Sequence, residues 1–343
     1  AAVGGGVYFT RLKSIHSIRK LTDYENYNLY RMDIDYAYDL DRLIDRGITD
    51  NQSMINAILA EALPYLPIHM KAPNFGCSAF CTQGTDGHTL MGRNYDFKND
   101  TSAMLVYCTP KDGYASVAFA ALDNINANTP DASMAKKLAT LTAPFICLDG
   151  MNEKGVSIAV LTLDSDPTYQ QTGKPMIATT LAIRLVLDRA ATTAEAVELL
   201  SKYDMFASSG RDYHFYITDA SGDGRVLEYD CNDPTRSVTN FFVMYKDNVL
   251  PNQRNGVYGH GRERYDAIEE ILDANAGSID REIAWQALQA ASQAPNPQDV
   301  TSNTQWSILY DNTALTAEAV IRRDWNTKTS YDLVSNVAVT DVG

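Results

Sequence analysis

No stretch of this 343-residue chain approaches the run of about 18–20 apolar residues that a membrane-spanning helix requires. Basic residues are also scarce, because 29 Lys and Arg stand against 43 Asp and Glu and give a formal net charge of −14. Binding to nucleic acid or to an anionic membrane surface depends on a basic protein surface. The sequence therefore predicts neither an integral membrane segment nor a nucleic-acid partner.

Several familiar site motifs are missing as well. The chain has no Gly-x-x-x-x-Gly-Lys loop, no His-Glu-x-x-His and no Cys-x-x-Cys, so phosphate-binding loops and common zinc sites lack support. Cys77 and Cys81 lie four apart with no matching pair elsewhere. We expect neither a metal nor an organic cofactor.

Cysteine is too rare for a disulfide scaffold. The odd number of cysteines in a long chain implies at least one free thiol. The cysteines are Cys77, Cys81, Cys108, Cys147 and Cys231. The chain starts with Ala1 rather than Met, which is typical of removal of a signal peptide and predicts an exported protein. A trimmed start would look the same, so a cytoplasmic location stays the alternative.

The segment 1–76 differs from the rest in composition and in its pattern of apolar residues. A Tyr-rich opening is followed by helical spacing of apolar residues at 40–44 and 55–63, and three prolines then precede Gly76 and Cys77. From Cys77 onward, strands and hairpins dominate, starting with the pair 78–82 and 89–97 around the turn at Asp86-Gly87.

Helices interrupt the later strands. The pattern predicts a helical block over 179–203, in two halves with a capping box at Thr192 and Glu195. The remaining predicted elements are helices at 265–272 and 281–291 and strands at 306–310 and 319–325. Strands without regular βαβ alternation indicate a layered α+β fold.

The first hairpin carries the best candidate chemistry. If Cys77 begins one strand and residues 93–97 end its neighbour, the turn brings the two ends together. A guanidinium such as that of Arg93 lowers the pKa of a neighbouring thiol. Strand alternation places Arg93 and Asp96 on opposite faces, so a local bend or bulge is needed for both to reach one site. A buried structural cysteine with a surface ion pair is the alternative from spacing alone.

Cys77, followed by Arg93 at the sixteenth and Asp96 at the nineteenth position after it, resembles the nucleophile region of the choloylglycine hydrolase and penicillin V acylase family. This family belongs to the N-terminal-nucleophile hydrolases. Residues 149–155 resemble its turn before an oxyanion strand, residues 213–228 its hairpin before a catalytic Asn, and residues 237–240 that Asn motif as in the acid ceramidase-like branch. The resemblance covers about residues 77–325.

The resemblance implies a four-layer αββα sandwich, with two antiparallel sheets between helical layers. It also implies that the bond between Gly76 and Cys77 is cut autocatalytically. Residues 1–76 would then form a pro-segment or a light chain, and 77–343 the hydrolase core. Gly76 suits the cut, because a residue without Cβ tolerates a strained backbone.

The implied chemistry is hydrolysis of a linear amide, a small-molecule partner, through a cysteine thioester. The freed α-amine of Cys77, with an ordinary pKa of about 7.7–8.0, would act as general base. Arg93 would hold the thiolate and Asp96 would orient the α-amine. Asn240 would donate to the oxyanion with a backbone N–H as partner, and Arg264 would brace this network, with Arg262 as the alternative.

The second oxyanion residue departs from the family, which has Asn in bile-salt enzymes and Tyr in penicillin acylases. Thr162 stands there, and its backbone N–H can still donate. The stretch from Asn240 to Arg264 is also only about half as long as in bile-salt hydrolases. We therefore expect an N-acyl amide as the first substrate class, with penicillin V-like and bile-salt-like amides as alternatives; homo-oligomer formation stays open.

Three alternatives accompany this prediction. The separation of His214 from Cys77 is typical of papain-like proteases, although Cys77 lacks their sequence setting. Cys81 is a second candidate nucleophile, for which a buried core thiol is the simpler interpretation. An uncleaved chain that only binds acyl ligands would use the same fold without turnover.

Overall fold

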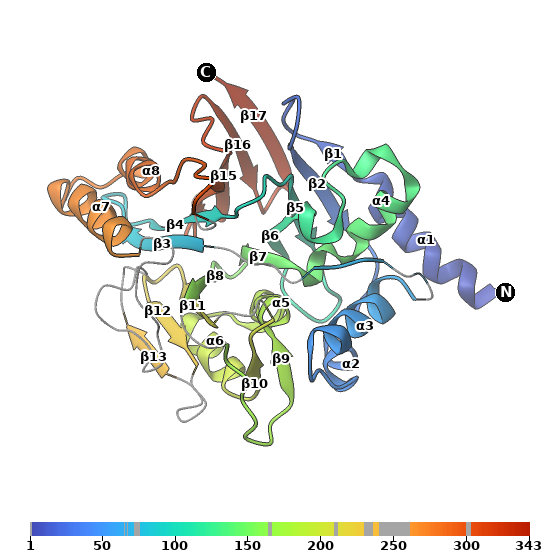
Figure 1. Ribbon diagram of the computed structural model, residues 1–343. Coiled ribbons are helices and arrows are strands. Elements are labelled where there is room, and N and C mark those ends of the chain that lie inside the picture. The colour runs from blue at the N-terminus through green and yellow to red at the C-terminus, as the bar shows by residue number, and fades with distance from the viewer. Residues whose placement is uncertain are drawn as a thin grey trace.

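The computed structural model describes residues 2–64, 66, 68–71, 76–163, 167–208, 212–229, 236–239, 261–299 and 303–343. Its centre consists of two sheets, shown in Figure 1. Within the described ranges, the larger sheet has nine strands in the order β1-β2-β5-β6-β7-β8-β11-β12-β13, and the smaller has six in the order β17-β16-β15-β14-β4-β3. A short parallel pair joins β9 (Met176–Ala178) to β10 (Asp204–Phe206).

The strands of the larger sheet are β1 (Arg19–Lys20), β2 (Leu29–Ile34), β5 (Ala103–Cys108), β6 (Ser116–Ala121), β7 (Cys147–Asn152), β8 (Ser157–Leu163), β11 (Asp212–Thr218), β12 (Gly224–Glu228) and β13 (Arg236–Thr239). Those of the smaller sheet are β3 (Gly76–Gln83), β4 (Thr89–Asp96), β14 (Thr304–Asp311), β15 (Thr316–Ile321), β16 (Thr327–Asp332) and β17 (Val337–Val342).

The α-helices are α1 (Ala2–His16), α2 (Leu40–Asp45), α3 (Asn51–Ala62), α4 (Met134–Ala139), α5 (Thr179–Arg189), α6 (Thr193–Leu200), α7 (Gly261–Ala274) and α8 (Arg281–Ala290). Three short 3-10 helices are η1 (Leu122–Ile125), η2 (Pro130–Ala132) and η3 (Thr140–Phe145). No helix in the described ranges is long and apolar enough to span a bilayer.

Helices cover the outer faces of both sheets, so the molecule has four layers. Helices α7 and α8 pack against β3, β4 and β14, whereas α5 and α6 pack against β7, β8, β11 and β12. The inner faces of the two sheets pack on each other, with strand β3 against β8. This arrangement confirms the expected α+β fold with helical layers outside two sheets.

Local signals correctly indicate several elements. Gly87, with φ of +82°, forms the β3–β4 turn at the predicted Asp86-Gly87 position. The helical block divides into α5 and α6, and Thr192 Oγ1 accepts a hydrogen bond from Glu195 N at 3.1 Å. The predicted strand 319–325 ends earlier, at Ile321, because Arg322 and Arg323 both adopt positive φ in the turn to β16.

The segment 1–76 is part of the larger sheet. Strand β2 pairs in parallel with β5 along its whole length, which makes this pair an exception to the antiparallel sheets expected. Leu29 and Met32 are fully buried in the same core as β5 and β6. Tyr38 Oη donates to Asp188 at 2.9 Å, so a polar contact also joins the segment to α5. Strand β2 mixes apolar and charged residues, and no clear strand pattern therefore marks it in the sequence.

We expect the 1–76 segment to stay bound after a break in the chain, because β2 and its buried side chains belong to the sheet. Residues 72–75 would be replaced by a specific protease site in a Cys77→Ala background and cut in vitro. Gel filtration should show both pieces in one peak, separating only in denaturant. Leu29→Asp with Met32→Asp should release the segment. An N-terminal piece that elutes alone without these substitutions would contradict the expectation.

Candidate active site

The thiol of Cys77 lies on the face of the smaller sheet that packs against the larger one. In the β3–β4 hairpin Cys77 pairs with Tyr95, and Ala79 pairs with Arg93. Because side chains alternate along a strand, these four residues share one face. Cys77 is 8% exposed and Arg93 is fully buried. The hairpin thus brings the thiol and the guanidinium together inside the protein, as the sequence predicts.

Arg93 is held by groups from three strands of the two sheets. Its Nε donates to Asp149 Oδ2 at 2.6 Å, and its Nη2 donates to the carbonyl oxygens of Leu148 and Val160, each at 3.3 Å. Its Nη1 donates to its neighbour's carbonyl on β4, that of Asn94, at 2.8 Å. The guanidinium therefore has little freedom to move away from the thiol.

Asp149 is satisfied by three donors. Besides Arg93, it accepts from Trp306 Nε1 at 3.1 Å and from Tyr310 Oη at 2.6 Å. Its side chain is fully buried, as is that of Arg93. The indole of Trp306 also stacks on the Tyr95 ring, with centroids 4.1 Å apart. In the sequence Asp149 is visible only as part of a turn motif, since no local pattern tells which arginine a carboxylate will meet across two sheets.

Burial dominates the titration of Cys77. It raises the pKa of this thiol above the ordinary value, although Arg93 and a hydrogen bond from the backbone of Asp96 act to lower it. The expectation that Arg93 lowers the thiol pKa therefore holds for its own contribution but not for the net direction. A thiol with a raised pKa keeps its proton at neutral pH, so a nearby base is needed to activate it.

Asp96 lies on the opposite face of the same hairpin, as alternation requires. It pairs with Gly76 and so stands beside the residue that precedes Cys77. Its carboxylate accepts hydrogen bonds from Arg264 Nη1 and, at 2.6 Å, from Thr304 Oγ1. Burial raises the pKa of Asp96, while Arg264 and Thr304 act to lower it. The bend or bulge expected to bring Arg93 and Asp96 to one face is absent from the β3–β4 pairing, and the only register shift beside β4 in the described residues lies in β14, between Thr304 and Trp306.

Arg264, in the first turn of α7, connects several parts of this face. Its Nη2 donates to Ser78 Oγ at 2.9 Å and its Nε to the Ala291 carbonyl at 2.8 Å. The structure thus places Arg264 at Asp96, directly behind the start of β3. The side chain of Arg262 and the whole of Asn240 lie outside the described residues.

The side chain of Thr162 points away from Cys77. Asp149, which reaches Arg93 in the other sheet, pairs with Ala159 on β8. Ala159 and Leu161 consequently face the smaller sheet, and Thr162 faces the α5 layer. Its Oγ1 has no hydrogen-bond partner among the described residues. Only the backbone of Thr162 remains available for the oxyanion role assigned to this position.

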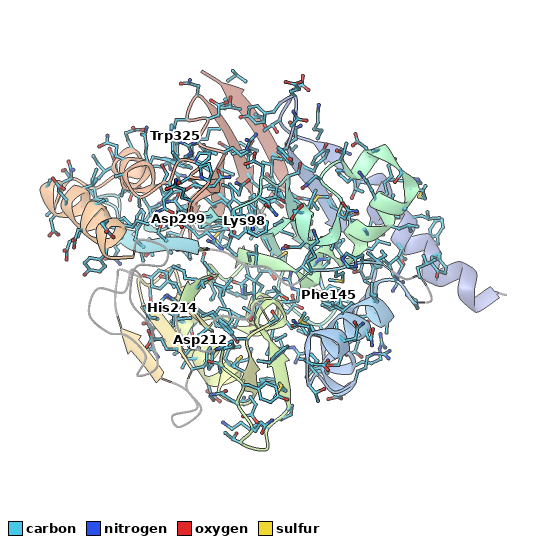
Figure 2. The ribbon with its side chains drawn as sticks, viewed as in Figure 1. Lys98, Phe145, Asp212, His214, Asp299 and Trp325 are labelled. Atoms are coloured by element: carbon cyan, nitrogen blue, oxygen red, sulfur yellow. The ribbon has the colours of Figure 1, made fainter. Side chains whose placement is uncertain are left out.

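His214 and Cys81 occupy other positions on the inner faces. His214, on β11 (Figure 2), is buried, and its Nδ1 lies 3.4 Å from Glu228 Oε1. Burial is the largest influence on the pKa of Cys77, followed by the charges of Arg93 and Asp96. Cys81 Sγ lies 3.3 Å from Thr218 Oγ1, and burial raises its pKa to about 11. These surroundings favour a core thiol at Cys81.

The Cys77 thiol and the Arg93 guanidinium lie on one face of the β3–β4 hairpin, and the Asp96 carboxylate lies on the other. Within the described ranges, no three His, Cys, Asp or Glu side chains are grouped to hold a metal ion. Once a base removes the thiol proton, a buried guanidinium can stabilise the resulting thiolate, which suits nucleophilic attack on a carbonyl carbon.

Comparisons with known proteins agree with this fold. Residues 77–244 match the family of linear amide C-N hydrolases, choloylglycine hydrolase family. The mutant C2A conjugated bile acid hydrolase from Clostridium perfringens is similar in structure, with a TM-score of 0.54 and 15% identity over 77% of this chain and 96% of that one. Penicillin V acylase from Agrobacterium tumefaciens has a TM-score of 0.52 and 17% identity over 75% and 86% of the two chains.

Replacing Asp149 by Asn should cost about 3–5 kcal/mol of the free energy of unfolding, because it leaves the buried Arg93 charge uncompensated. Equilibrium urea unfolding measures this loss. Asp41→Asn is the matched control, since Asp41 pairs with Arg189 in a largely exposed ion pair at 2.8 Å. Its loss should cost about 0–1 kcal/mol. Equal losses for the two variants would show that the Arg93–Asp149 pair is not a structural anchor.

Proposed function

Because residues 77–244 belong to the linear amide C-N hydrolases of the choloylglycine hydrolase family, we propose that this hydrolase cleaves a linear amide with Cys77 as its nucleophile. The observation that carries the proposal is the placement of Cys77 and the buried Arg93 on one face of the β3–β4 hairpin, where Asp149 fixes the guanidinium from the other sheet. An N-acyl amide of a small amine is the substrate class we propose.

The first step is maturation of the chain at Gly76 and Cys77. The thiol attacks the Gly76 carbonyl carbon, the thiol proton passes to the Cys77 nitrogen, the C–N bond breaks, and the acyl group moves from nitrogen to sulfur. Water then hydrolyses this thioester and leaves a carboxylate on Gly76 and a free α-amine on Cys77. Asp96 supports this step by its position opposite Gly76, where its carboxylate can hold the new amine.

The α-amine then replaces a catalytic histidine. In its neutral form it takes the proton of the Cys77 thiol, and the sulfur attacks the carbonyl carbon of the substrate amide. Arg93 stabilises the negative sulfur. The oxyanion of the tetrahedral intermediate accepts hydrogen bonds from the Asn240 amide and from a backbone N–H, for which Thr162 is the candidate. Each such donor is worth about 3–4 kcal/mol in comparable sites.

Collapse of the intermediate completes the first half of the reaction. The C–N bond breaks, the protonated α-amine returns its proton to the leaving amine, and an acyl thioester remains on Cys77. The α-amine next deprotonates a water molecule, which attacks the thioester and releases a carboxylic acid. Arg264 acts indirectly, because its contacts with Asp96 and Ser78 hold the carboxylate and the start of β3 in place.

We expect purified protein to contain two pieces, 1–76 and 77–343, the larger starting at Cys77. Denaturing intact-mass measurement with N-terminal sequencing checks this result. Cys77→Ala should remain a single chain and hydrolyse no amide, whereas Cys81→Ala, which removes the other thiol on this strand, should be cut normally. A wild-type chain that stays whole under all conditions, acid pH included, would overturn the mechanism, and ligand binding without turnover would then be the better explanation.

The rate of hydrolysis should depend on pH through the neutral range. The α-amine accepts a proton only when neutral, so kcat/KM should rise as the pH passes its ordinary pKa of about 7.7–8.0. Because burial raises the pKa of the thiol, the proton stays on sulfur until the amine removes it. A bell-shaped or rising profile agrees with this pairing. A flat profile between about pH 5 and 9, with the fold intact by circular dichroism, would refute it.

A further inference from the structure

Strand β14 contains a β-bulge beside Asp96. Thr304 pairs with Asp96 and Trp306 pairs with Tyr95, so two residues of β14 pass along a single residue of β4. Gln305 is the extra residue between them. In a regular strand, residues two apart share a face, whereas here Thr304 and Trp306 face opposite sides of the sheet.

The bulge lets one strand serve both buried carboxylates of the candidate site. Thr304 Oγ1 donates to Asp96 Oδ1 at 2.6 Å on the face that helices α7 and α8 cover. Trp306 Nε1 donates to Asp149 Oδ2 at 3.1 Å on the face between the two sheets. Without the extra residue, β14 would present only one of these two donors to the correct face. Bulges occur beside active sites because they redirect a side chain in this way.

The side chain of Gln305 fixes the bulge. It is fully buried, and its Oε1 accepts from Thr101 N at 2.9 Å. Its Nε2 donates to the Phe97 carbonyl at 3.3 Å. These bonds tie the extra residue to the chain that follows β4, so the position of Thr304 beside Asp96 is fixed as well.

The proton of the Thr304 hydroxyl points at Asp96. Gln293 N donates to Thr304 Oγ1 at 2.7 Å, and Thr304 N donates to the Gln293 carbonyl at 2.9 Å. A backbone N–H can only donate, so the hydroxyl accepts from Gln293 and gives its own proton to Asp96. Arg264 Nη1 donates to the other oxygen of the same carboxylate. Both oxygens of Asp96 thus accept a hydrogen bond, which favours the ionised form.

Burial opposes the charge on Asp96. Asp96 and Thr304 are both fully buried, and burial raises the pKa of Asp96, whereas Arg264 and Thr304 act to lower it. The titratable groups that interact with Asp96 come from three elements and are Arg264 of α7, Arg93 and Tyr95 of β4, and Cys77 of β3. Thr304 is a neutral donor, so removing its hydroxyl alters the ionisation of Asp96 without adding or removing a charge.

We propose that Thr304 is a positioning residue for amide hydrolysis, whose hydroxyl fixes Asp96 as the carboxylate that holds the α-amine of Cys77. This inference rests on the role proposed above for Asp96. A carboxylate that already accepts from Thr304 and Arg264 attracts the proton of an ammonium group less strongly than one with fewer donors. The amine therefore reaches its neutral form closer to neutral pH, where it can take the thiol proton.

Thr304→Val tests this role, because valine has nearly the same shape without the hydroxyl. In self-cleaved protein with a chromogenic N-octanoyl anilide, the rising limb of kcat/KM should move up by about one pH unit. The rate should then fall about 10-fold near neutral pH and approach the wild-type rate at alkaline pH. Thr304→Ser, which keeps the hydroxyl, should restore the wild-type profile. A loss by the same factor at every pH, or no shift at all, would overturn the proposal.

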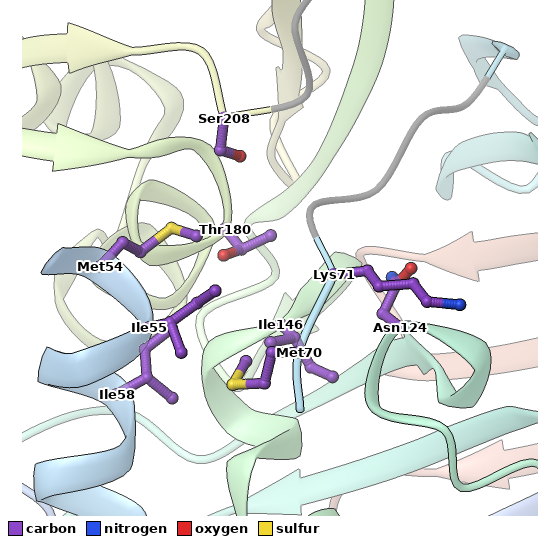
Figure 3. Close-up of a pocket in the computed structure, with 9 residues that line it drawn as sticks. All are labelled: Met54, Ile55, Ile58, Met70, Lys71, Asn124, Ile146, Thr180 and Ser208. Atoms are coloured by element: carbon purple, nitrogen blue, oxygen red, sulfur yellow. The ribbon is translucent and has the colours of Figure 1, made fainter. Parts of the chain in front are cut away.

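Two threonines in other parts of the fold serve as controls. Thr172 Oγ1 donates to Asp204 Oδ1 at 2.6 Å, which is the same kind of bond at the same length as that of Thr304. Thr180 is buried like Thr304 and lines a cavity of about 10 Å³ beside α3, about the room that one water molecule needs (Figure 3). Thr172→Val and Thr180→Val should leave the position of the pH profile unchanged. A shift in either control as large as that in Thr304→Val would contradict a specific role for Thr304.

A measurement without turnover separates this inference from the mechanism. In uncut Cys77→Ala protein, NMR of labelled aspartate carboxyl carbons follows the ionisation of Asp96, whose signal is identified by its loss in Asp96→Asn. Thr304→Val should raise the midpoint of this titration by about one pH unit, and Thr304→Ser should not. An unchanged midpoint, with an intact fold by circular dichroism, overturns the role of Thr304 and leaves the mechanism standing. A wild-type chain that stays whole overturns the mechanism, and the titration then still decides whether Thr304 controls the ionisation of Asp96.

Discussion

The buried ion pair between Arg93 and Asp149 is the interaction on which the candidate site depends. Arg93 comes from β4 and Asp149 from β7, so one contact joins the two sheets and fixes the cation beside the Cys77 thiol. Burying two charges is costly unless further hydrogen bonds satisfy them. The donors from Trp306 and Tyr310 to Asp149 and the carbonyl acceptors around Arg93 supply these bonds. The same network thus holds the sheets together and positions the chemistry.

A second ion pair lies on the other face of the β3–β4 hairpin. Asp96 contacts Arg264 from α7, just as Arg93 contacts Asp149 from β7. The stretch from Gly76 to Ser78 runs between the two pairs, with the thiol facing one and Ser78 Oγ facing the other. Each face of the hairpin therefore has its own buried ion pair, and these two pairs fix the backbone at Gly76 from both sides. Arg93 and Asp96 can therefore serve one place without sharing a face.

Local sequence signals predict the parts of the site that lie within one hairpin. Asp86-Gly87 marks the β3–β4 turn, and alternation puts Arg93 and Asp96 on opposite faces. The partners that come from distant strands cannot be predicted in this way, because sheet order decides them. Asp149 reaches Arg93 only because β7 packs opposite β4. The outward direction of the Thr162 side chain follows from the pairing of Asp149 with Ala159, which fixes the faces of β8. The parallel pairing of β2 likewise depends on its contact with β5.

The place of residues 1–76 follows from the same long-range contacts. Strand β2 extends the larger sheet beyond β5, and α3 lies against η3, the 3-10 helix that leads into β7 and Asp149. The segment therefore extends and packs against the sheet that carries Asp149, and Asp149 in turn binds Arg93. A break at Gly76 would change a covalent connection into a packed interface without removing any of these contacts. Freeing the α-amine of Cys77 is then compatible with keeping the Arg93–Asp149 pair in place, because the strands that hold the pair stay in register.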